Sequence, residues 1–217
     1  MIGFYNYTVI LTYLSLLSGV CGIWLSVDGH PLLAMLCLLF CGLCDMFDGR
    51  VARTKKDRTP AEQKFGIQLD SLCDIVCFGV FPAVNVIVLC QNAWYAYVVA
   101  ALYVLAGVIR LAYFNVMEEE RQQKGNRPRT VYAGLPITTA AMIFPVCFCF
   151  SGLAEKHMVW FRTALCAVMA LTGLLFVAPI RVRKPRFREL MVILAVGLLV
   201  AAVITLVWLQ RNWRIFG

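Results

Sequence analysis

Apolar runs of roughly twenty residues alternate with short polar connections along this chain. A helix needs about 20 predominantly apolar residues to cross the hydrocarbon core of a bilayer. The runs that we interpret as such spans are 8–27, 31–53, 66–90, 93–116, 133–153, 160–179 and 190–209. Pro82 lies inside the third run and predicts a kink there, because proline removes a backbone hydrogen bond. The pattern predicts an all-α, polytopic transmembrane helix bundle.

Composition supports this interpretation and limits the number of domains. The 217 residues are 61% hydrophobic and 15% charged, and the mean hydropathy is +0.78, which is far too apolar for a water-soluble domain. No polar stretch is long enough for a second folded unit, so residues 1–217 are expected to form a single integral membrane domain. Most of the 10 cysteines lie within apolar runs, which favours reduced packing residues over disulfides.

The net charge of +8 indicates membrane topology rather than nucleic-acid binding. The basic residues gather in short connections, without a pattern typical of DNA or RNA recognition. Most of the 20 Lys and Arg residues lie in three connections, at 50–64, 121–129 and 181–188. Because cytoplasmic connections carry the excess of positive charge, these three are expected at the cytoplasmic face, with the N-terminus inside and the C-terminus outside. Their charge also favours contact with anionic membrane lipids.

Four carboxylates interrupt the apolar pattern at the ends of two neighbouring runs. Asp45 and Asp48 are three residues apart and Asp70 and Asp74 are four apart, so each pair lies on one face of a helix. An uncompensated aspartate near the centre of a membrane helix costs about 3 kcal/mol, so these side chains need a positive partner. Both histidines are distant in sequence, and the nearby thiols are few against four hard oxygen ligands. The set favours Mg²⁺ or Mn²⁺ over Zn²⁺.

Small residues and an arginine accompany these carboxylates. Gly49, Ala52 and Gly66 each lie one helical turn from one of the aspartates. Small side chains on the carboxylate face would let a ligand approach the backbone closely. Arg53, one turn after Gly49, can offer a bidentate guanidinium to a phosphate group.

Two segments combine these residues in one pattern, Asp45-x2-Asp48-Gly49-x2-Ala52-Arg53 and Gly66-x3-Asp70-x3-Asp74. Every position of this pattern matches the signature of the CDP-alcohol phosphotransferase family of integral membrane enzymes, which the chain therefore resembles. The interval between Arg53 and Gly66 is longer than is usual in that family. We expect a longer loop there that leaves the site intact.

The resemblance implies a fold, a reaction and roles for the site residues. The family has a six-helix core, so the last run is expected to be about one extra C-terminal helix, and a homodimer is expected. Two divalent ions held by the four aspartates are expected to bind the pyrophosphate of a CDP-linked lipid. Asp74 is the expected catalytic base for the acceptor hydroxyl. The small residues Gly49, Ala52 and Gly66 are expected beside the cytidine, and Arg53 beside the departing CMP.

Further segments resemble the CDP-diacylglycerol–serine phosphatidyltransferases. They are FGIQLDSL (65–72), FGVFPA (78–83), RLAYFN (110–115) and GLP (134–136). The expected reaction is transfer of a phosphatidyl group from CDP-diacylglycerol to L-serine, with CMP as the second product. Relatives use inositol phosphate, glycerol phosphate or choline instead, so the acceptor stays open.

Arg110 is the basic residue that the sequence places well inside a membrane helix. It either binds a substrate phosphate or carboxylate, or it snorkels its guanidinium to the interface. A phosphorylated acceptor would require a denser basic pocket. A single intramembrane arginine therefore favours an unphosphorylated acceptor such as serine, whose carboxylate Arg110 could bind.

A membrane transporter is the alternative to an enzyme, since intramembrane carboxylates also form proton relays and cation sites. A relay would spread its acids across the bilayer and show paired repeats, whereas these four cluster at one surface. The enzyme interpretation is therefore favoured. A compact chain without a transit peptide favours a prokaryotic plasma membrane, with the active site at its cytoplasmic face.

Overall fold

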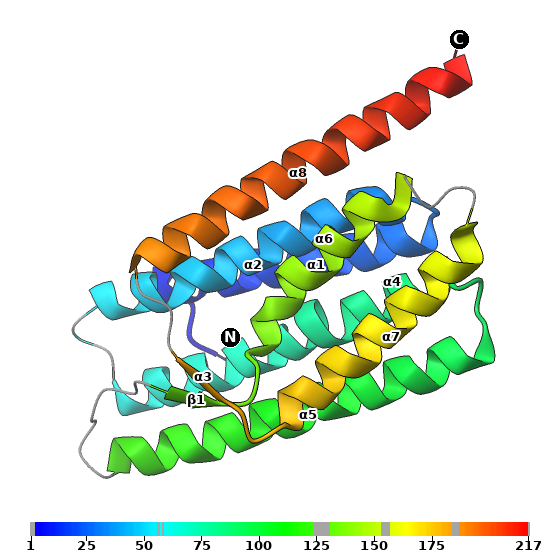
Figure 1. The fold of residues 1–217 in the computed structure, drawn as a ribbon. Coiled ribbons are helices and arrows are strands. Elements are labelled where there is room, and N and C mark those ends of the chain that lie inside the picture. Colours follow the sequence, from blue (N-terminus) through cyan, green and yellow to red (C-terminus); the bar gives the residue numbers. More distant parts are fainter. Residues whose placement is uncertain are drawn as a thin grey trace.

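The computed structural model describes residues 3–55, 57, 59–123, 131–152, 157–183 and 187–216, except for the side chains of 53, 121–123, 131–133, 152, 181–188, 190 and 210–216. Its α-helices are α1 (Ile10–Val27), α2 (Pro31–Thr54), α3 (Pro60–Asp74), α4 (Phe81–Leu89), α5 (Trp94–Gln123), α6 (Ala140–Cys149), α7 (Met158–Val177) and α8 (Phe187–Phe216). The shorter elements are η1 (Tyr7–Val9), the π-helix η2 (Ile75–Val80), η3 (Ile137–Thr139), η4 (Phe150–Gly152), β1 (Val131–Ala133) and β2 (Arg181–Arg183). The helices form one bundle, and α8 lies along its edge (Figure 1).

Within the described residues, six helical stretches are long and apolar enough to cross a membrane. They are Tyr7–Val27, Pro31–Ala52, Pro60–Leu89, Trp94–Glu120, Met158–Val177 and Met191–Leu209. One further apolar helix, Ile137–Cys149, is shorter. The predicted polytopic helical bundle is therefore confirmed.

The fifth apolar run is broken, although the sequence predicted a full span over 133–153. The strand β1 pairs antiparallel with β2, with Tyr132 opposite Val182. The chain then turns at Gly134, whose φ is +76° and whose N–H donates to the Ile180 carbonyl at 2.8 Å. Glycine adopts this left-handed conformation without strain. Because α6 begins only after the turn, it is too short to cross the bilayer as a regular helix.

The third run is one helical stretch made of α3, η2 and α4. Pro82 lacks an N–H, and its ring opposes the carbonyl of Phe78, four residues earlier. The chain widens into the π-helix Ile75–Val80 just before this proline, and the buried Tyr103 hydroxyl donates to the Phe78 carbonyl at 2.6 Å. The irregularity expected from Pro82 therefore takes the form of a π-helix.

Helix α1 packs closely against this stretch because it presents small residues to it. A Cβ at Gly19 would lie 2.8 Å from Cys77 Sγ, and a Cβ at Gly22 would lie 2.2 Å from Phe81 Cζ. The Ser15 hydroxyl also lies 3.6 Å from Cys77 Sγ. Small residues that let two backbones approach are typical of packed membrane helices. We call the contact of Ser15, Gly19 and Gly22 with Cys77 and Phe81 the α1 seam.

Large aromatic side chains fill the core between α4, α5, α6 and α7. The Tyr103 ring contacts Phe144 and Phe176 at centroid distances of 5.8 and 5.3 Å. All three side chains are almost fully buried. The cysteines, every one of which is described, are free thiols, as the sequence predicted.

Two helices continue past the boundaries that hydropathy predicts. Helix α5 runs to Gln123, beyond the end of the predicted apolar run 93–116. Helix α3 begins at Pro60, inside the loop predicted between Arg53 and Gly66. Hydropathy marks the part of a helix that lies in lipid, whereas capping and helix propensity decide where the helix ends.

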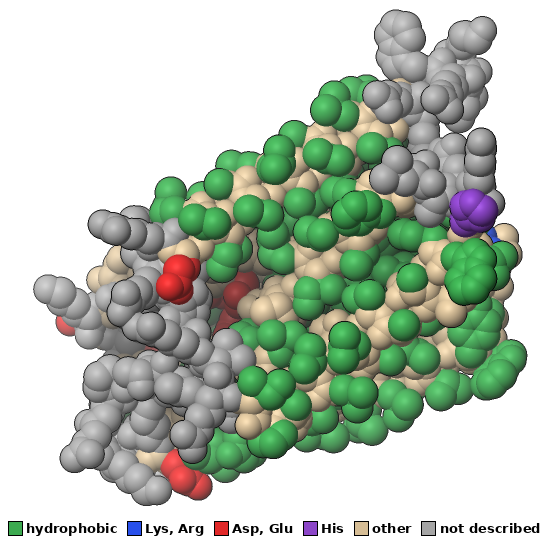
Figure 2. Space-filling view, in the orientation of Figure 1, with side chains coloured by type: hydrophobic (Ala, Val, Ile, Leu, Met, Phe, Trp, Pro, Cys, Tyr) green, Lys and Arg blue, Asp and Glu red, His purple; other side chains and the backbone are tan. Residues whose placement is uncertain are grey.

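The connections that the sequence places on one side of the membrane do lie at one end of the bundle. In Figure 1 the end of α2, the start of α3, the end of α5, the strands β1 and β2 and the start of α8 are all on the left, and the C-terminus lies at the opposite end. Figure 2 shows apolar side chains over the flank of the bundle, and acidic side chains at this end and inside a hollow beside it. We call this end of the bundle, where α2 ends and α3 begins, the carboxylate end.

Candidate functional site

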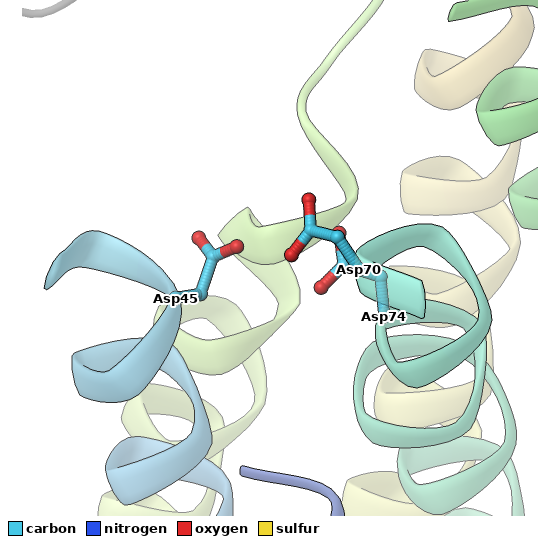
Figure 3. Close-up of side chains that lie close together, drawn as sticks. All are labelled: Asp45, Asp70 and Asp74. Carbon is cyan, nitrogen blue, oxygen red and sulfur yellow. The ribbon is translucent and has the colours of Figure 1, made fainter. Parts of the chain in front are cut away.

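Three aspartate side chains converge near the carboxylate end. Asp45 projects from α2, and Asp70 and Asp74 face it from α3 across a gap (Figure 3). One carboxylate oxygen of each residue lies within 4.8 Å of the other two. That separation is comparable to the ~4 Å between opposite ligands of an octahedral Mg²⁺ site, where metal–oxygen distances are ~2.1 Å.

Asp48 is the fourth predicted ligand, one helical turn along α2 from Asp45. Its carboxyl group interacts electrostatically with those of Asp45 and Asp70. The group of three close carboxylates does not include Asp48. The structure therefore brings all four acids to one end of the bundle and places Asp48 at the edge of the cluster.

The helices that carry the acids share one main neighbour, α1, and differ in the others. Helix α2 packs mainly against α1, α6 and α8, whereas α3 packs mainly against η2, α1 and α5. The spacing of Asp70 and Asp74 puts both on the face of α3 that looks toward α2. The carboxylates thus face each other across the space between two helices that both pack against α1.

A cavity of about 1160 Å³ begins at the aspartates and continues along the bundle. Its polar wall includes Asp45, Arg50, Asp70, Ser71, Asp74, Arg110, Asn115, Glu118, Thr138 and Thr139. Its apolar wall comes from α2, α6 and α8 and includes Leu36, Leu39, Phe40, Met142, Val196 and Leu198. The volume lies slightly above the ~300–1,000 Å³ found for ligand pockets. A charged head and an apolar slot therefore share one continuous space.

Arg110 lies inside this site. The residue is only 9% exposed, lines the cavity and acts electrostatically on Asp45. Its guanidinium carbon lies 6.0 Å from the centroid of the Phe114 ring. This position beside the buried acids favours the first of the two alternatives for Arg110 over snorkelling, which would carry the side chain away from them. Binding of a substrate anion stays a prediction.

Several cavity residues were not singled out by the sequence. Arg50, which was counted with a basic connection, lines the cavity as a second arginine, so Arg110 is not the single basic residue in it. Ser71 donates from its hydroxyl to Asn115 Oδ1 at 2.9 Å and so joins α3 to α5 beside Asp70. Helical spacing could have indicated Asn115, because Arg110, Asn115 and the cavity-lining Glu118 lie on neighbouring parts of one α5 face.

The small residues of the signature have different positions. Of the three, all of which the structure describes, Gly49 lines the cavity, whereas Ala52 and Gly66 lie half-buried on α2 and α3 outside its wall. The Arg53 side chain lies outside the described residues. Contact of these residues with a nucleotide stays a prediction.

The donor set fits a hard divalent cation. The three closest groups are carboxylates, which offer only oxygen ligands. Oxygen ligands suit Mg²⁺ or Mn²⁺, whereas zinc sites are usually built from histidine and cysteine. The close approach of three negative groups in a partly apolar surrounding also requires positive charge nearby. Arg110 supplies one such charge, and a bound cation would supply the remainder.

Comparisons with known proteins agree with this site. A sequence model of the CDP-alcohol phosphatidyltransferase family matches residues 5–215. The chain is 32% identical over 133 residues to a CDP-diacylglycerol–serine O-phosphatidyltransferase of Mycobacterium tuberculosis, over 61% of this chain and 45% of that protein. A Helicobacter pylori protein of the same description is 29% identical over 223 residues, over 95% of this chain and 83% of that protein.

An archaeal relative has a related description. The archaetidylserine synthase of Methanothermobacter thermautotrophicus is 32% identical over 161 residues, over 74% of this chain and 65% of that protein. The chain thus spans about half the length of the mycobacterial relative and most of the Helicobacter one. The family match covers the spans and the four aspartates, so the chain is an integral membrane protein, and Asp45, Gly49, Asp70 and Asp74 line one cavity in it.

Proposed function

The chain belongs to the CDP-alcohol phosphatidyltransferase family, and we propose that it transfers a phosphatidyl group from CDP-diacylglycerol to the hydroxyl of L-serine, releasing CMP. One observation carries the proposal. Asp45, Asp70 and Asp74 meet at the polar head of a cavity whose wall along α2, α6 and α8 is largely apolar. A charged nucleotide and pyrophosphate suit the first part, and lipid tails suit the second.

The side chains at the head would divide the chemistry between them. Two divalent ions, Mg²⁺ or Mn²⁺, would be held by Asp45, Asp48, Asp70 and Asp74. When bound, such ions offset the charge of the pyrophosphate and polarise its phosphorus. Asp74 takes the proton of the serine hydroxyl as general base. The serine oxygen forms a bond to the phosphatidyl phosphorus while the bond from that phosphorus to CMP breaks. Arg53 and Gly49 would lie beside the CMP part.

The acceptor would enter beside α5. Arg110 is buried in the cavity wall and can bind the serine carboxylate through paired N–H donors. The Asn115 carbonyl oxygen already accepts from Ser71, which leaves its amide N–H groups as donors toward the cavity. Because Arg50 also lines the cavity, basic charge alone does not select serine over a phosphorylated acceptor. The preference for serine rests on the descriptions of the relatives.

The donor tails would lie along the apolar wall between α2, α6 and α8. Leu36, Phe40 and Val196 belong to this wall and lie toward the middle of the bundle relative to the aspartates. A lipid can keep its tails in this slot while its nucleotide remains at the carboxylate end. By the charge of its connections, that end would face the cytoplasm, in a prokaryotic plasma membrane, and the protein would act as a homodimer.

CMP release by the purified protein tests this function. CDP-diacylglycerol is supplied with Mg²⁺ or Mn²⁺ and with serine, inositol phosphate, glycerol phosphate or choline in separate reactions. We expect CMP with serine, and none from the Asp74→Asn variant or in the presence of EDTA. Release with another acceptor alone would keep the chemistry and change the substrate. A folded, metal-binding protein that releases no CMP with any acceptor would contradict the proposal and favour transport.

A further inference from the structure

The connection between α2 and α3 is where this chain departs from the family signature. The interval from Arg53 to Gly66 is longer in this chain than is usual in that family. In the structure α2 ends at Thr54 and α3 begins at Pro60, so much of the interval is helix rather than loop. The first turns of α3 therefore precede Gly66 and carry side chains that the shorter interval would have no room for.

Glu62, in the first turn of α3, joins three segments of the chain. Its Oε1 accepts from Asn6 Nδ2 at 3.1 Å and from Lys55 Nζ at 2.8 Å. Its Oε2 accepts from the Thr59 backbone N–H at 2.9 Å, and the Thr59 hydroxyl accepts in return from the Glu62 N–H at 3.2 Å. This capping box fixes the start of α3. The same carboxylate thus ties the N-terminal segment and the end of α2 to the start of α3.

Further contacts hold the same three segments together. Asn6 Oδ1 accepts from the Thr8 backbone N–H at 3.1 Å and so orders the turn η1. The Tyr7 hydroxyl lies 3.1 Å from Thr54 Oγ1, at the end of α2. We call the set of Asn6, Lys55, Thr59 and Glu62 the Glu62 junction. The side chains of Lys55 and Glu62 are 27% and 13% exposed, against 67% and 58% for the pair of Lys64 and Glu119.

The Glu62 junction links the two helices that carry the carboxylates. Asp48 lies about two helical turns before Lys55, and Asp70 lies about two turns after Glu62. Apart from this link, α1 packs against both helices, whereas α6 and α8 pack against α2, and η2 and α5 pack against α3. The position of one carboxylate pair relative to the other therefore depends on how the ends of α2 and α3 are joined. Cation sites are sensitive to such displacements, because bound oxygens must lie within a few tenths of an ångström of their ideal distance.

We propose that Glu62 is a positioning residue for the metal-binding carboxylates: by joining Asn6, Lys55 and Thr59 it sets the distance between Asp45 and the Asp70–Asp74 pair. The proposal rests on the metal-dependent function proposed above. The interval between Arg53 and Gly66, which contains Glu62, would thereby affect the affinity for the cation. Glu62 itself does not contact the cation or the substrate.

Two substitutions separate this role from helix capping. Glutamine is accepted at the third position of a capping box, so Glu62→Gln can keep the start of α3. It loses the negative charge and one of the two acceptors, and with them the bonds to Lys55 and Asn6. Lys55→Met removes the other half of the ion pair. Lys64→Met is the matched control, because Lys64 lies on α3 and pairs with Glu119 at 3.3 Å, with side chains 67% and 58% exposed.

Direct binding of Mn²⁺ to the purified protein, without substrate, is the first measurement. Electron paramagnetic resonance counts free Mn²⁺ and needs no turnover. We expect the dissociation constant to rise about tenfold in Glu62→Gln, as for loss of groups that orient metal ligands, and several-fold in Lys55→Met. In Lys64→Met the dissociation constant should stay within about twofold of that of the protein without substitutions, as expected for an exposed surface pair.

CMP release at increasing Mn²⁺ concentration is the second measurement. In Glu62→Gln the half-saturating Mn²⁺ concentration should rise by the same factor, while kcat at saturating Mn²⁺ stays within about twofold. A loss of folded protein would instead lower the rate without moving the metal dependence. Asn6→Ala leaves the ion pair and the capping box in place and should give a smaller shift in the same direction.

The outcomes are distinguishable. If the Glu62→Gln variant binds Mn²⁺ with the same dissociation constant as the Lys64→Met variant, the inference is overturned and the proposed function stays intact. The same holds if kcat falls while the Mn²⁺ affinity is unchanged. If Glu62→Gln does not fold, Lys55→Met and Asn6→Ala decide in the same way. If the protein without substitutions binds no Mn²⁺, the proposed metal-dependent function is overturned, and the inference with it.

Discussion

The helical stretch from Pro60 to Leu89 contains two regions of opposite character. In α3, Asp70 and Asp74 face Asp45 across a cavity, and their oxygens lie within 4.8 Å of one another. A few turns later the same stretch forms the α1 seam, where a Cβ at Gly22 would lie 2.2 Å from Phe81. The first region keeps like charges together beside open space, and the second leaves no space at all.

The difference indicates that one region serves the reaction and the other serves the fold. Like charges at short distance destabilise a folded protein unless a ligand offsets them. Close packing stabilises the bundle and fixes the helix from which the acids project. Substitutions in the two regions should therefore separate activity from stability.

The largest effect is expected at the carboxylate end. Asp74→Asn removes the proposed base and one metal ligand, so the rate of CMP release should fall by about 10³-fold. The midpoint of thermal unfolding in EDTA should stay unchanged or rise, because one of three repelling charges is gone. Rate assays and unfolding of the same detergent-purified sample check both. A variant that keeps a tenth of the rate would contradict the assignment of Asp74 as base.

Gly134→Ala tests the turn that leads into the cavity wall. The new Cβ would lie 2.4 Å from the Phe176 carbonyl oxygen, and the backbone has φ of +76°. We expect a loss of about 3 kcal/mol in the free energy of unfolding from clash and strain together. Gly29→Ala is the matched control, because φ is +87° there and nothing lies within 4 Å of the new Cβ. Its cost should be about 1 kcal/mol from strain alone. Equal costs at both positions would show that the contact with Phe176 contributes nothing.

Gly22→Ala tests the α1 seam. The methyl group would overlap the buried Phe81 ring, so unfolding should become easier by about 2 kcal/mol. The rate per folded molecule should change less than about twofold, because the seam does not touch the cavity. Gly197→Ala on α8 provides the comparison, since its Cβ would meet only Met142 Sδ at 3.7 Å. A Gly22→Ala protein with full stability would mean that α1 and α4 can separate without cost.

The sequence predicted the carboxylate end better than the rest of the molecule. Asp45, Asp70 and Asp74 could be identified because acids are costly inside apolar runs and because helical spacing puts a pair on one face. The burial of Arg110 could not be predicted, since snorkelling and burial share the same sequence pattern. Only the packing of α5 against the other helices decides between them.

The sequence was least informative where backbone geometry decides. The run over 133–153 is apolar throughout, and hydropathy cannot show that Gly134 turns the chain out of helix. Pro82 indicated a distortion but not its form as a π-helix. Glu62 was overlooked, although Thr59-x-x-Glu62 is a readable capping box, because its partner Asn6 is far away in sequence. Contacts between distant segments leave no periodic signal in the chain.

The boundary between the two regions lies in the π-helix, and Tyr103 tests where it falls. The Tyr103 hydroxyl donates at 2.6 Å to the carbonyl of Phe78, whose partner four residues later in a regular helix would be Pro82, which has no N–H. Tyr103→Phe leaves this buried carbonyl without the hydroxyl and should cost about 1 kcal/mol of unfolding free energy.

Tyr97→Phe is the control for Tyr103→Phe, because its hydroxyl donates to Asn92 Oδ1 at the exposed surface and its loss should cost less than about 0.5 kcal/mol. If the π-helix belongs with the seam, Tyr103→Phe lowers stability and leaves the rate of CMP release within about twofold. If it instead holds Asp74, which immediately precedes it, the rate falls more than tenfold while stability falls little. The second result would show that the π-helix belongs to the site rather than to the structural region. Its distortion would then contribute little to stability and would serve to orient the base, Asp74.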